Sequence, residues 1–401
     1  MKILMLTPYL PYPLYSGGQI RTYNLLKNLS KKHEISLFSF IRSEKETQYI
    51  PELQKFCRQV RVFKRRQAWD LRNIFLAAFS PYPFLVSIYL SRSLKRTIET
   101  ELMTGNYDLI HAETFYVMPN LPKNISVPTL LVEQTIEYLV YQKFVETTKL
   151  LLLKPLLYLD VAKIKLWEKY FWNQATRLAA MSESDKQIMQ DQTGKKVSID
   201  VVANGVDVDF FASEKKALTR QPTVLFVGNF KWLPNKDAAK FLVRQIWPLI
   251  KKALPQARLW IVGRNPTQDI LNLDSQPGVT VRANVSDIRQ VLRQAHVLLA
   301  PIRNGRGTKY KVLEAMASGL PVVTTKLGIE GIDYSNSVLI AEDAPGLAKE
   351  TLSILTDKTL SANLAAKARK IVYSQYNWPI ISQQLDSIYL KLGYGSINHN
   401  H

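Results

Sequence analysis

The stretch HVLLAPIRNGRGTKYKVLEAMASGLPVVTT, residues 296–325, holds the pattern that decides the fold. It begins with an apolar run, 296–301, and continues through a basic, glycine-containing loop. A helical pattern starts near Lys309, and a second apolar run, 320–325, follows it. A strand, a helix and a strand in this order form a βαβ unit, and such units build parallel sheets. The stretch therefore predicts an α/β protein.

Ten further apolar runs alternate with helical patterns on both sides of a turn at Asn204-Gly205. We expect two doubly wound, Rossmann-like domains in tandem, 1–203 and 204–377, that face an interdomain cleft. The final helical segment, 378–393, could cap the second domain or cross back to the first, and its pattern fits both. The ten runs are KILMLT (2–7), EISLFSF (34–40), QVRVFK (59–64), YDLIHA (107–112), PTLLVE (128–133), TRLAAMS (176–182), TVLFVG (223–228), RLWIVG (258–263), VTVRA (279–283) and SVLIAE (337–342).

Length and cysteine content narrow the class of protein. The chain has 401 residues, enough for two domains with cores of ordinary size. A single cysteine, Cys57, excludes an intramolecular disulfide and fits a reducing cytosol. The apolar start is too short for a signal peptide and runs into prolines, so we expect a buried strand there.

Two apolar segments raise the question of a membrane span. Residues 74–90 carry no charge but have Pro81 and Pro83 at their centre, and residues 150–162 are broken by Lys154, Pro155 and Asp160. A helix that crosses a bilayer needs about 20 apolar residues in succession. We therefore expect neither segment to cross a membrane.

The net charge of +20 indicates an anionic partner. Residues 58–96 hold nine Lys and Arg against one acid, Asp70, with aromatic and leucine side chains between them. This mixture fits a segment that binds an anionic membrane surface, and a solvated basic face over core residues fits it equally well. No nucleic-acid recognition motif accompanies the charge, so we expect no nucleic-acid partner.

The loop and helix start within the opening stretch predict an anion site. Backbone amides of a glycine-containing loop and of a helix N-terminus attract anions, and Arg306, Lys309 and Lys311 add positive charge. Glu314, expected about one turn into the helix, offers two acceptor oxygens for the hydroxyls of a ribose. A nucleotide satisfies both features. A helix with a favourable glutamate and solvated lysines is the plainer alternative.

A second glycine-containing helix start follows the first strand. Gly17 and Gly18 end the loop after residues 2–7, and Arg21 lies one turn further on. We expect the glycines to let backbone amides approach an anion. The dinucleotide fingerprint G-x-G-x-x-G is absent from the sequence, which argues against a nicotinamide or flavin enzyme.

Together these segments resemble the retaining GT-B glycosyltransferases of family 4, also called group 1 glycosyl transferases. The resemblance covers nearly the whole chain. It implies a nucleotide-sugar donor, a final helix that crosses back to the N-terminal domain, and a donor-binding C-terminal domain. The motifs that carry it are the Gly17-Gly18 loop with Arg21, NGVD (204–207), VGNFKWLPN (227–235), IVGRNP (261–266) and VLEAMASGLPVVTT (312–325).

The resemblance also implies roles for single residues. Glu314 would bind the donor ribose, and Val285 would lie at the edge that binds the base. From the placement of charge, beside the roles that the resemblance implies, we expect Arg306, Lys309 and Lys311 to stabilise the leaving diphosphate and Glu113 to orient the acceptor. The other donor-binding residues that the resemblance implies are Gly17, Gly18, Arg21, Gly228, Asn229, Gly263, Arg264, Gly307, Thr308 and Lys309.

Arg306 departs from the family pattern, because most members have a glutamate there that contacts the donor sugar. An exopolysaccharide branch of the family shows the same replacement. His111, at the end of a strand, fits a core histidine as well as a catalytic one. The Asp-x-Asp at 207–209 lies in the interdomain turn, so we interpret it as structural.

The sequence thus predicts a cytoplasmic enzyme, peripheral on the inner face of the membrane through 58–96. It would move a sugar, from a UDP-sugar before other donors, to a hydroxyl of a glycan or lipid-linked acceptor with retention of configuration. Basic groups would neutralise the diphosphate without a metal or other cofactor. Two alternative functions share this fold. One is a sugar-nucleotide epimerase, which would convert the donor to an isomer without an acceptor, and the other is a catalytically inactive GT-B binding protein.

Overall fold

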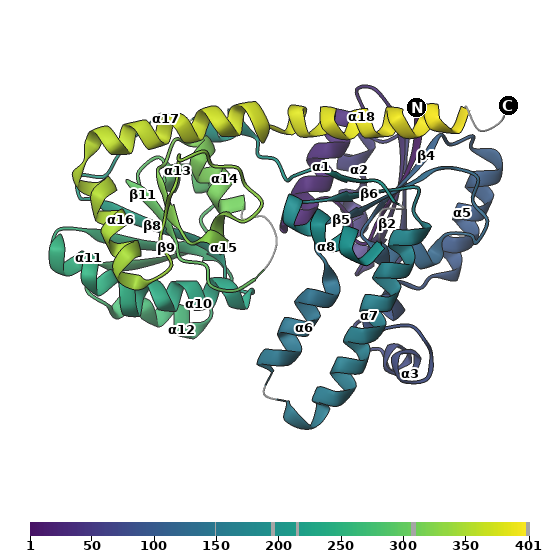
Figure 1. The fold of residues 1–401 in the computed structure, drawn as a ribbon, viewed down its shortest axis with the longest axis horizontal. Helices are drawn as coiled ribbons and strands as arrows, with labels where there is room; N and C mark the ends of the chain where they lie inside the picture. The colour runs from purple at the N-terminus through teal and green to yellow at the C-terminus, as the bar shows by residue number, and fades with distance from the viewer. Residues whose placement is uncertain (149, 194–196, 214–215, 306–309, 398–401) are drawn as a thin grey trace. The chain divides into compact units, whose positions relative to one another are not determined.

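The computed structural model describes residues 1–148, 150–193, 197–213, 216–305 and 310–397. The chain divides into two compact units. Unit 1 comprises Met1–Ala203 and Ile381–His401, and unit 2 comprises Asn204–Ile380 (Figure 1). Each unit contains one sheet of parallel strands covered by helices, so the predicted pair of Rossmann-like folds is confirmed.

The sheet of unit 1 has the strand order β3-β2-β1-β4-β5-β6-β7. Successive strands move from β1 to one edge and then restart on its other side, which is the doubly wound arrangement with its switch point between β1 and β4. The strands are β1 (Lys2–Thr7), β2 (Glu34–Ile41), β3 (Gln59–Lys64), β4 (Leu109–Glu113), β5 (Thr129–Glu133), β6 (Arg177–Ala180) and β7 (Ile199–Val201).

Helices cover the faces of this sheet and extend from it. They are α1 (Gly17–Leu29), α2 (Ile50–Gln54), α3 (Leu71–Phe79), α4 (Phe84–Tyr89), α5 (Arg92–Thr104), α6 (Glu137–Thr147), α7 (Lys154–Gln174), α8 (Glu183–Thr193) and most of α18 (Trp378–Ile397). Short helical turns lie at η1 (Glu44–Tyr49), η2 (Phe115–Asn120) and η3 (Leu151–Leu153).

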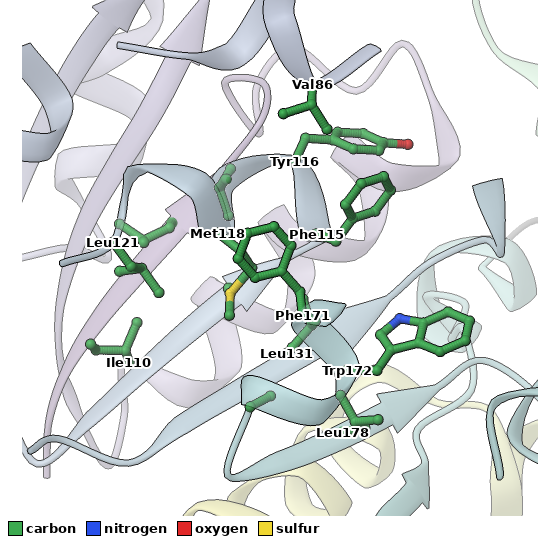
Figure 2. Packing of buried hydrophobic residues seen from close by; sticks show 14 of the residues in the cluster. Val86, Ile110, Phe115, Tyr116, Met118, Leu121, Leu131, Phe171, Trp172 and Leu178 are labelled. Atoms are coloured by element: carbon green, nitrogen blue, oxygen red, sulfur yellow. The ribbon is translucent and has the colours of Figure 1, made fainter. Parts of the chain in front are cut away.

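The core of unit 1 joins β-strand residues to the inner sides of these helices. Figure 2 shows part of it, in which Phe171 and Trp172 of α7 belong to the same buried cluster as Leu131 and Leu178 of the sheet. Trp172 is fully buried, and its indole N–H donates to Glu133 Oε1 at 3.0 Å. The base of α7 is therefore fixed in the core, whereas its first turns extend beyond the sheet (Figure 1).

Helix α18 is tied to unit 1 by polar contacts. Asp386 lies 2.6 Å from Lys32 Nζ and 2.8 Å from His33 Nε2, and both partners follow α1. The hydroxyl of Tyr389, which is fully buried, is hydrogen-bonded to His111 Nδ1 of β4. Of the two alternatives predicted for the last helix, the structure has the one in which it returns to the first unit.

The sheet of unit 2 has the order β10-β9-β8-β11-β12-β13, with a switch point between β8 and β11. Its strands are β8 (Thr223–Asn229), β9 (Arg258–Arg264), β10 (Val279–Ala283), β11 (Val297–Ala300), β12 (Val322–Thr324) and β13 (Leu339–Ile340). Its helices are α9 (Val208–Ala212), α10 (Leu233–Phe241), α11 (Trp247–Ala253), α12 (Gln268–Leu271), α13 (Ile288–Leu292), α14 (Tyr310–Ala317), α15 (Lys326–Ile329), α16 (Ala344–Thr356) and α17 (Lys358–Gln375), with a π turn η5 (Leu242–Ile246) and a short turn η6 (Asn272–Ser275).

The opening stretch folds as β11, α14 and β12. All four residues of β11 are buried, as in a central parallel strand. Gly319 follows the end of helix α14, and its φ of +64° is a left-handed conformation that glycine adopts without strain. The amide of Leu320 donates to the carbonyl of Ala315 at 2.8 Å, which closes the helix end. The predicted βαβ unit is confirmed.

The NGVD segment starts unit 2. Val206 forms a bridge with Asn377, and Asp207 caps α9 because its Oδ1 accepts from the Phe210 amide at 3.0 Å. A Cβ atom on Gly205 would lie 2.7 Å from the ring of Trp378, so the motif needs a glycine for packing. The structural interpretation of the Asp-x-Asp therefore has a specific basis in this cap.

Candidate functional site

The candidate site of unit 2 lies at the carboxyl ends of β8 and β9 and on the adjacent helix α14. Ligands of doubly wound folds bind at this edge, beside the switch point. Lys311 and Glu314 come from α14, and Arg264 ends β9. Both cations act electrostatically on the carboxyl group of Glu314. The structure thus brings Arg264 together with Lys311 and Glu314, which lie on a helix much later in the sequence.

Glu314 is half-buried and is the fifth residue of α14 as the structure describes it. It therefore lies about one turn from Tyr310. Burial raises the pKa of Glu314 to about 7, even though Lys311 and Arg264 oppose this rise. A carboxyl group with this pKa is poised between an acceptor and a donor of hydrogen bonds at neutral pH.

Lys311 is held in place by two contacts. Its Nζ donates to Asn235 Oδ1 at 2.7 Å and lies 4.7 Å from the ring centroid of Phe226. Asn235 in turn donates from Nδ2 to the carbonyl of Asn229 at 2.9 Å. The ammonium group is therefore directed by a polar and an aromatic partner rather than left to move in solvent. Asn235 and Phe226 are site residues that the sequence analysis does not single out.

The glycines at this edge are required by close packing. A Cβ atom on Gly263 would lie 1.7 Å from the carbonyl oxygen of Gly228, and one on Gly228 would lie 3.1 Å from Asn235. Gly305 has a φ of +95°, and a side chain there would meet Pro234. These glycines thus keep the strand ends and the following loops close together, which leaves their backbone groups near the site.

The end of β10 completes this edge. Asn284 has a φ of +52°, and its amide donates to the carbonyl of Gly263 at 2.9 Å. Val285, the predicted neighbour of a base, follows it and is half-buried. Arg306, Gly307, Thr308 and Lys309 lie outside the described residues.

In unit 1, Gly17 and Gly18 open α1, whose N-cap is Ser16. The sequence predicts that these glycines let a ligand approach, but Gly18 is also required by packing inside unit 1. A Cβ atom on Gly18 would lie 2.1 Å from the hydroxyl of Tyr9 and 2.6 Å from Gln134 Oε1. Tyr9 itself donates to that oxygen at 2.9 Å. Gly18 is therefore fixed by internal packing, whatever its amide binds.

Arg21 lies in the interior of unit 1 rather than at an open anion site. Its side chain is fully buried, and Nη1 donates to the carbonyl of Ala203 at 2.8 Å. Its positive charge acts on Glu113 and Tyr389. In the structure Arg21 thus acts on Glu113, the residue predicted to orient the acceptor.

Glu113 is fully buried, so it does not lie on an open surface. Oε1 lies 3.2 Å from His111 Nε2, and Oε2 accepts from Gln134 Nε2 at 2.6 Å. Burial alone would raise the pKa of Glu113, but the partner His111, the charge of Arg21 and the bond from Gln134 hold that pKa below its ordinary value. The carboxylate is stabilised as an anion inside a polar network.

A separate group of acids lies at the base of α6 and α7. Glu168 Oε1 and Oε2 accept from the amides of Glu137 and Tyr138 at 2.7 and 2.9 Å, so this α7 side chain caps α6. Burial raises the pKa of Glu137 to about 7. Burial, and then the nearby charge of Glu168, raise the pKa of Glu133 well above its ordinary value. Sequence reasoning does not identify this cluster, because its members lie on three different elements.

The described residues contain neither a metal-binding cluster nor a membrane-spanning helix. No group of three or more His, Cys, Asp or Glu side chains among them is arranged to hold a metal ion. No helix formed by them is both long and apolar enough to cross a membrane.

The comparisons with known proteins match both units. Residues 15–210 match the family described as Glycosyltransferase Family 4, and residues 221–357 match the one described as Glycosyl transferases group 1. The chain belongs to glycosyltransferase family 4. This confirms the resemblance found in the sequence motifs.

Relatives of this family-4 chain include bacterial glycosyltransferases. The phosphatidyl-myo-inositol mannosyltransferase of Mycolicibacterium smegmatis is 29% identical over 200 residues, which are 47% of this chain and 50% of that protein. The capsular polysaccharide biosynthesis glycosyltransferase CapM of Staphylococcus aureus is 26% identical over 244 residues, 56% of this chain and 64% of CapM. The matched region thus spans between half and two thirds of these relatives.

Solved structures of the same fold cover almost the whole chain. Sucrose-phosphate synthase from Thermosynechococcus elongatus has a TM-score of 0.70 at 17% identity and covers 98% of this chain and 100% of its own. Anabaena HepE in complex with UDP has a TM-score of 0.66 at 15% identity, with the same coverage. These similarities establish the GT-B fold of the family-4 chain.

Proposed function

We propose that this chain transfers a sugar from a nucleoside diphosphate to a hydroxyl group of an acceptor, with retention of anomeric configuration. The observation that carries the proposal is the meeting of Lys311, Arg264 and Glu314 at the carboxyl edge of the unit 2 sheet. A nucleotide has a diol for the carboxylate and a diphosphate for the cations. UDP is the nucleotide we propose, because HepE is a structural relative that was solved with UDP.

The difficult step of this reaction is the departure of the diphosphate leaving group. The bond between the anomeric carbon and the phosphate oxygen breaks, and the acceptor oxygen bonds to the same face of the sugar. The acceptor proton passes to the leaving phosphate. Lys311, oriented by Asn235, supplies fixed positive charge where negative charge develops, and such preorganised charge is an effective form of catalysis. We propose that these basic groups act without a metal ion.

We further propose that the acceptor is a glycan or a lipid-linked sugar used in polysaccharide or glycoconjugate synthesis. One relative is named as a capsular polysaccharide biosynthesis glycosyltransferase and another as a phosphatidyl-myo-inositol mannosyltransferase. A place at the inner face of an anionic membrane would suit a lipid-linked acceptor. The basic segment 58–96 and the net charge of +20 support that location.

A thermal-shift panel tests the donor site. UDP, GDP, ADP and dTDP are each added with and without magnesium, and a nucleotide that binds the folded chain must raise the melting temperature. We expect UDP to give the largest shift, with or without metal. Glu314→Gln should remove most of it, whereas the matched variant Glu350→Gln on α16 should keep it. No shift with any nucleotide at millimolar concentration would refute the proposed donor site.

A further inference from the structure

The described part of unit 1 exposes an apolar surface that the proposed reaction does not use. Helices α6 and α7 form a hairpin that projects from the sheet, with η3 at its tip (Figure 1). At the tip, Leu151 is 70% exposed and Leu152 is 97% exposed. Leucine side chains in such number normally avoid water, and a large apolar patch marks an interaction site. The exposed large hydrophobic residues of the hairpin are Val140, Phe144, Leu150, Leu151, Leu152, Leu153, Leu156, Tyr158, Leu159, Leu166 and Tyr170.

These side chains are not displaced core residues. The inner side of α7 is complete, because Val161, Ile164 and Phe171 are buried on it. The hairpin is also clamped at its base, where Glu168 of α7 accepts from two amides at the start of α6. The apolar tip is thus presented by a fixed support.

Helix α3 adds to the same surface, because it is held against α7. Lys163 Nζ donates to the carbonyls of Ala77 and Ser80 at 2.6 and 2.9 Å, and the Trp167 indole donates to the carbonyl of Pro81 at 2.8 Å. Figure 1 shows α3 beside α7. The exposed large hydrophobic residues that this segment contributes are Trp69, Leu71, Ile74, Phe75 and Phe79.

The charge around this apolar surface is positive. Lys143, Lys165 and Lys169 are exposed on the hairpin, and Arg72 is exposed on α3. One nearby acid, Glu146 of α6, is exposed and pairs with Lys143 at 3.4 Å. The other acids have internal partners. Asp70 caps α3, Asp160 accepts from the amide of Phe84 at 2.8 Å, and Glu168 is buried. A surface of apolar and basic side chains is complementary to anionic lipid, which offers both negative headgroups and an apolar interior.

We infer that the surface formed by α3 and the α6–α7 hairpin inserts into the interface of an anionic bilayer. This deepens the membrane location in the proposed function, on which it rests, and extends the attachment from the segment 58–96 to the α6–α7 hairpin, whose leucine and aromatic side chains insert into the bilayer. A second copy of the chain fits less well. In a symmetric pair the same basic residues would face each other, and their like charges would repel.

Vesicle flotation with the full chain tests this inference. The probes are phosphatidylcholine vesicles with and without about 30 mol% phosphatidylglycerol, because the surface requires anionic lipid. We expect binding to the anionic vesicles that persists in part at about 0.5 M salt, where surface electrostatics are screened. The double variant Leu151→Ser/Leu152→Ser should bind at least about tenfold more weakly, since two inserted leucines are lost. The matched double variant Leu218→Ser/Leu249→Ser on unit 2 should bind as the parent does.

Quenching by brominated lipid gives a readout that a merely structural effect would not produce. Trp69 is 78% exposed on the proposed surface, and Trp232 is 63% exposed on unit 2. Trp69→Phe should remove much of the quenchable fluorescence, whereas Trp232→Phe should not. These positions are exposed, so the variants should melt as the parent does.

Two results would overturn the inference. One is equal vesicle binding by the parent and the tip variant, which would mean that basic residues alone attach the chain to the membrane. The other is no vesicle binding, together with a concentration-dependent dimer that the tip variant abolishes. The nucleotide panel on the same preparations separates this outcome from the reaction: a UDP shift without lipid binding refutes only the insertion, and lipid binding without a UDP shift refutes only the donor site.

Discussion

Glu314 gives the donor site a pH dependence that can be measured. Burial raises its pKa in the folded chain to about 7, above the ordinary value of 4.5. Between these values the folded chain holds a proton that the unfolded chain has lost, so this group makes stability fall as pH rises toward 7. Glu314→Gln removes the effect and should stabilise the chain by about 1–2 kcal/mol at pH 8, after allowance for partial exposure, and by little at pH 5.

Nucleotide affinity should change with pH in the opposite direction. The ribose diol needs the ionised carboxylate as acceptor, so UDP should bind more tightly as pH rises through about 7. Calorimetric titration between pH 5.5 and 8.5 measures this in the parent, and Glu350→Gln serves as the matched control. A parent affinity that does not vary over this range would contradict the role of Glu314.

A second buried acid, Glu133, should lower the stability of the folded chain at high pH. Its pKa is raised by burial and by the charge of Glu168, and Oε1 accepts from the indole of Trp172. Glu133→Gln keeps an acceptor for the indole and removes a buried charge, so it should raise the free energy of unfolding by about 1–3 kcal/mol at pH 8. The gain should shrink at pH 5, where the acid is protonated. Denaturant unfolding at both pH values checks this, and a loss of stability at pH 8 would disprove it.

At this scale the sequence predicts residue types better than their contacts. Lys311 and Glu314 were recognisable because a helix after a glycine-containing loop makes an anion site. Asn235, which orients Lys311, lies 76 residues away, and no local pattern connects the two. Glu113 ends β4, and its partners Gln134 and Arg21 come from two other segments of the chain. Such partners are set by tertiary packing.

At the scale of elements, α18 should depend on Asp386. Burial alone would raise the pKa of Asp386, but the hydrogen bonds from Lys32 and His33 hold it below its ordinary value. Its stabilising effect is therefore present at neutral pH and is lost as pH falls through that lowered pKa. Asp386→Ala should cost about 1–3 kcal/mol at pH 7 and speed hydrogen exchange across residues 381–393. Gln383→Ala, on the exposed side of α18, is the control, and equal exchange in both variants would contradict the anchoring role.

The elements themselves were largely predictable. Twelve apolar runs in the sequence correspond to strands, because buried parallel strands are continuous apolar stretches. The strand β7 was missed, since it has only three residues and Asp200 at its centre. The α6–α7 hairpin could not be recognised as a surface feature. Its leucines have the composition of a core helix, and only the structure shows that several of them face outward.

For the whole molecule, the two compact units predict two unfolding transitions in calorimetry. Each unit has its own sheet and buried core, and the described donor-site residues Arg264, Lys311 and Glu314 all lie in unit 2. Saturating UDP should therefore raise the transition of unit 2 by several degrees and that of unit 1 by much less. Asp386→Ala should lower the transition of unit 1, because Lys32, His33 and Asp386 belong to it. A single transition that UDP raises and Asp386→Ala lowers as a whole would show that the units unfold together, and would contradict this prediction.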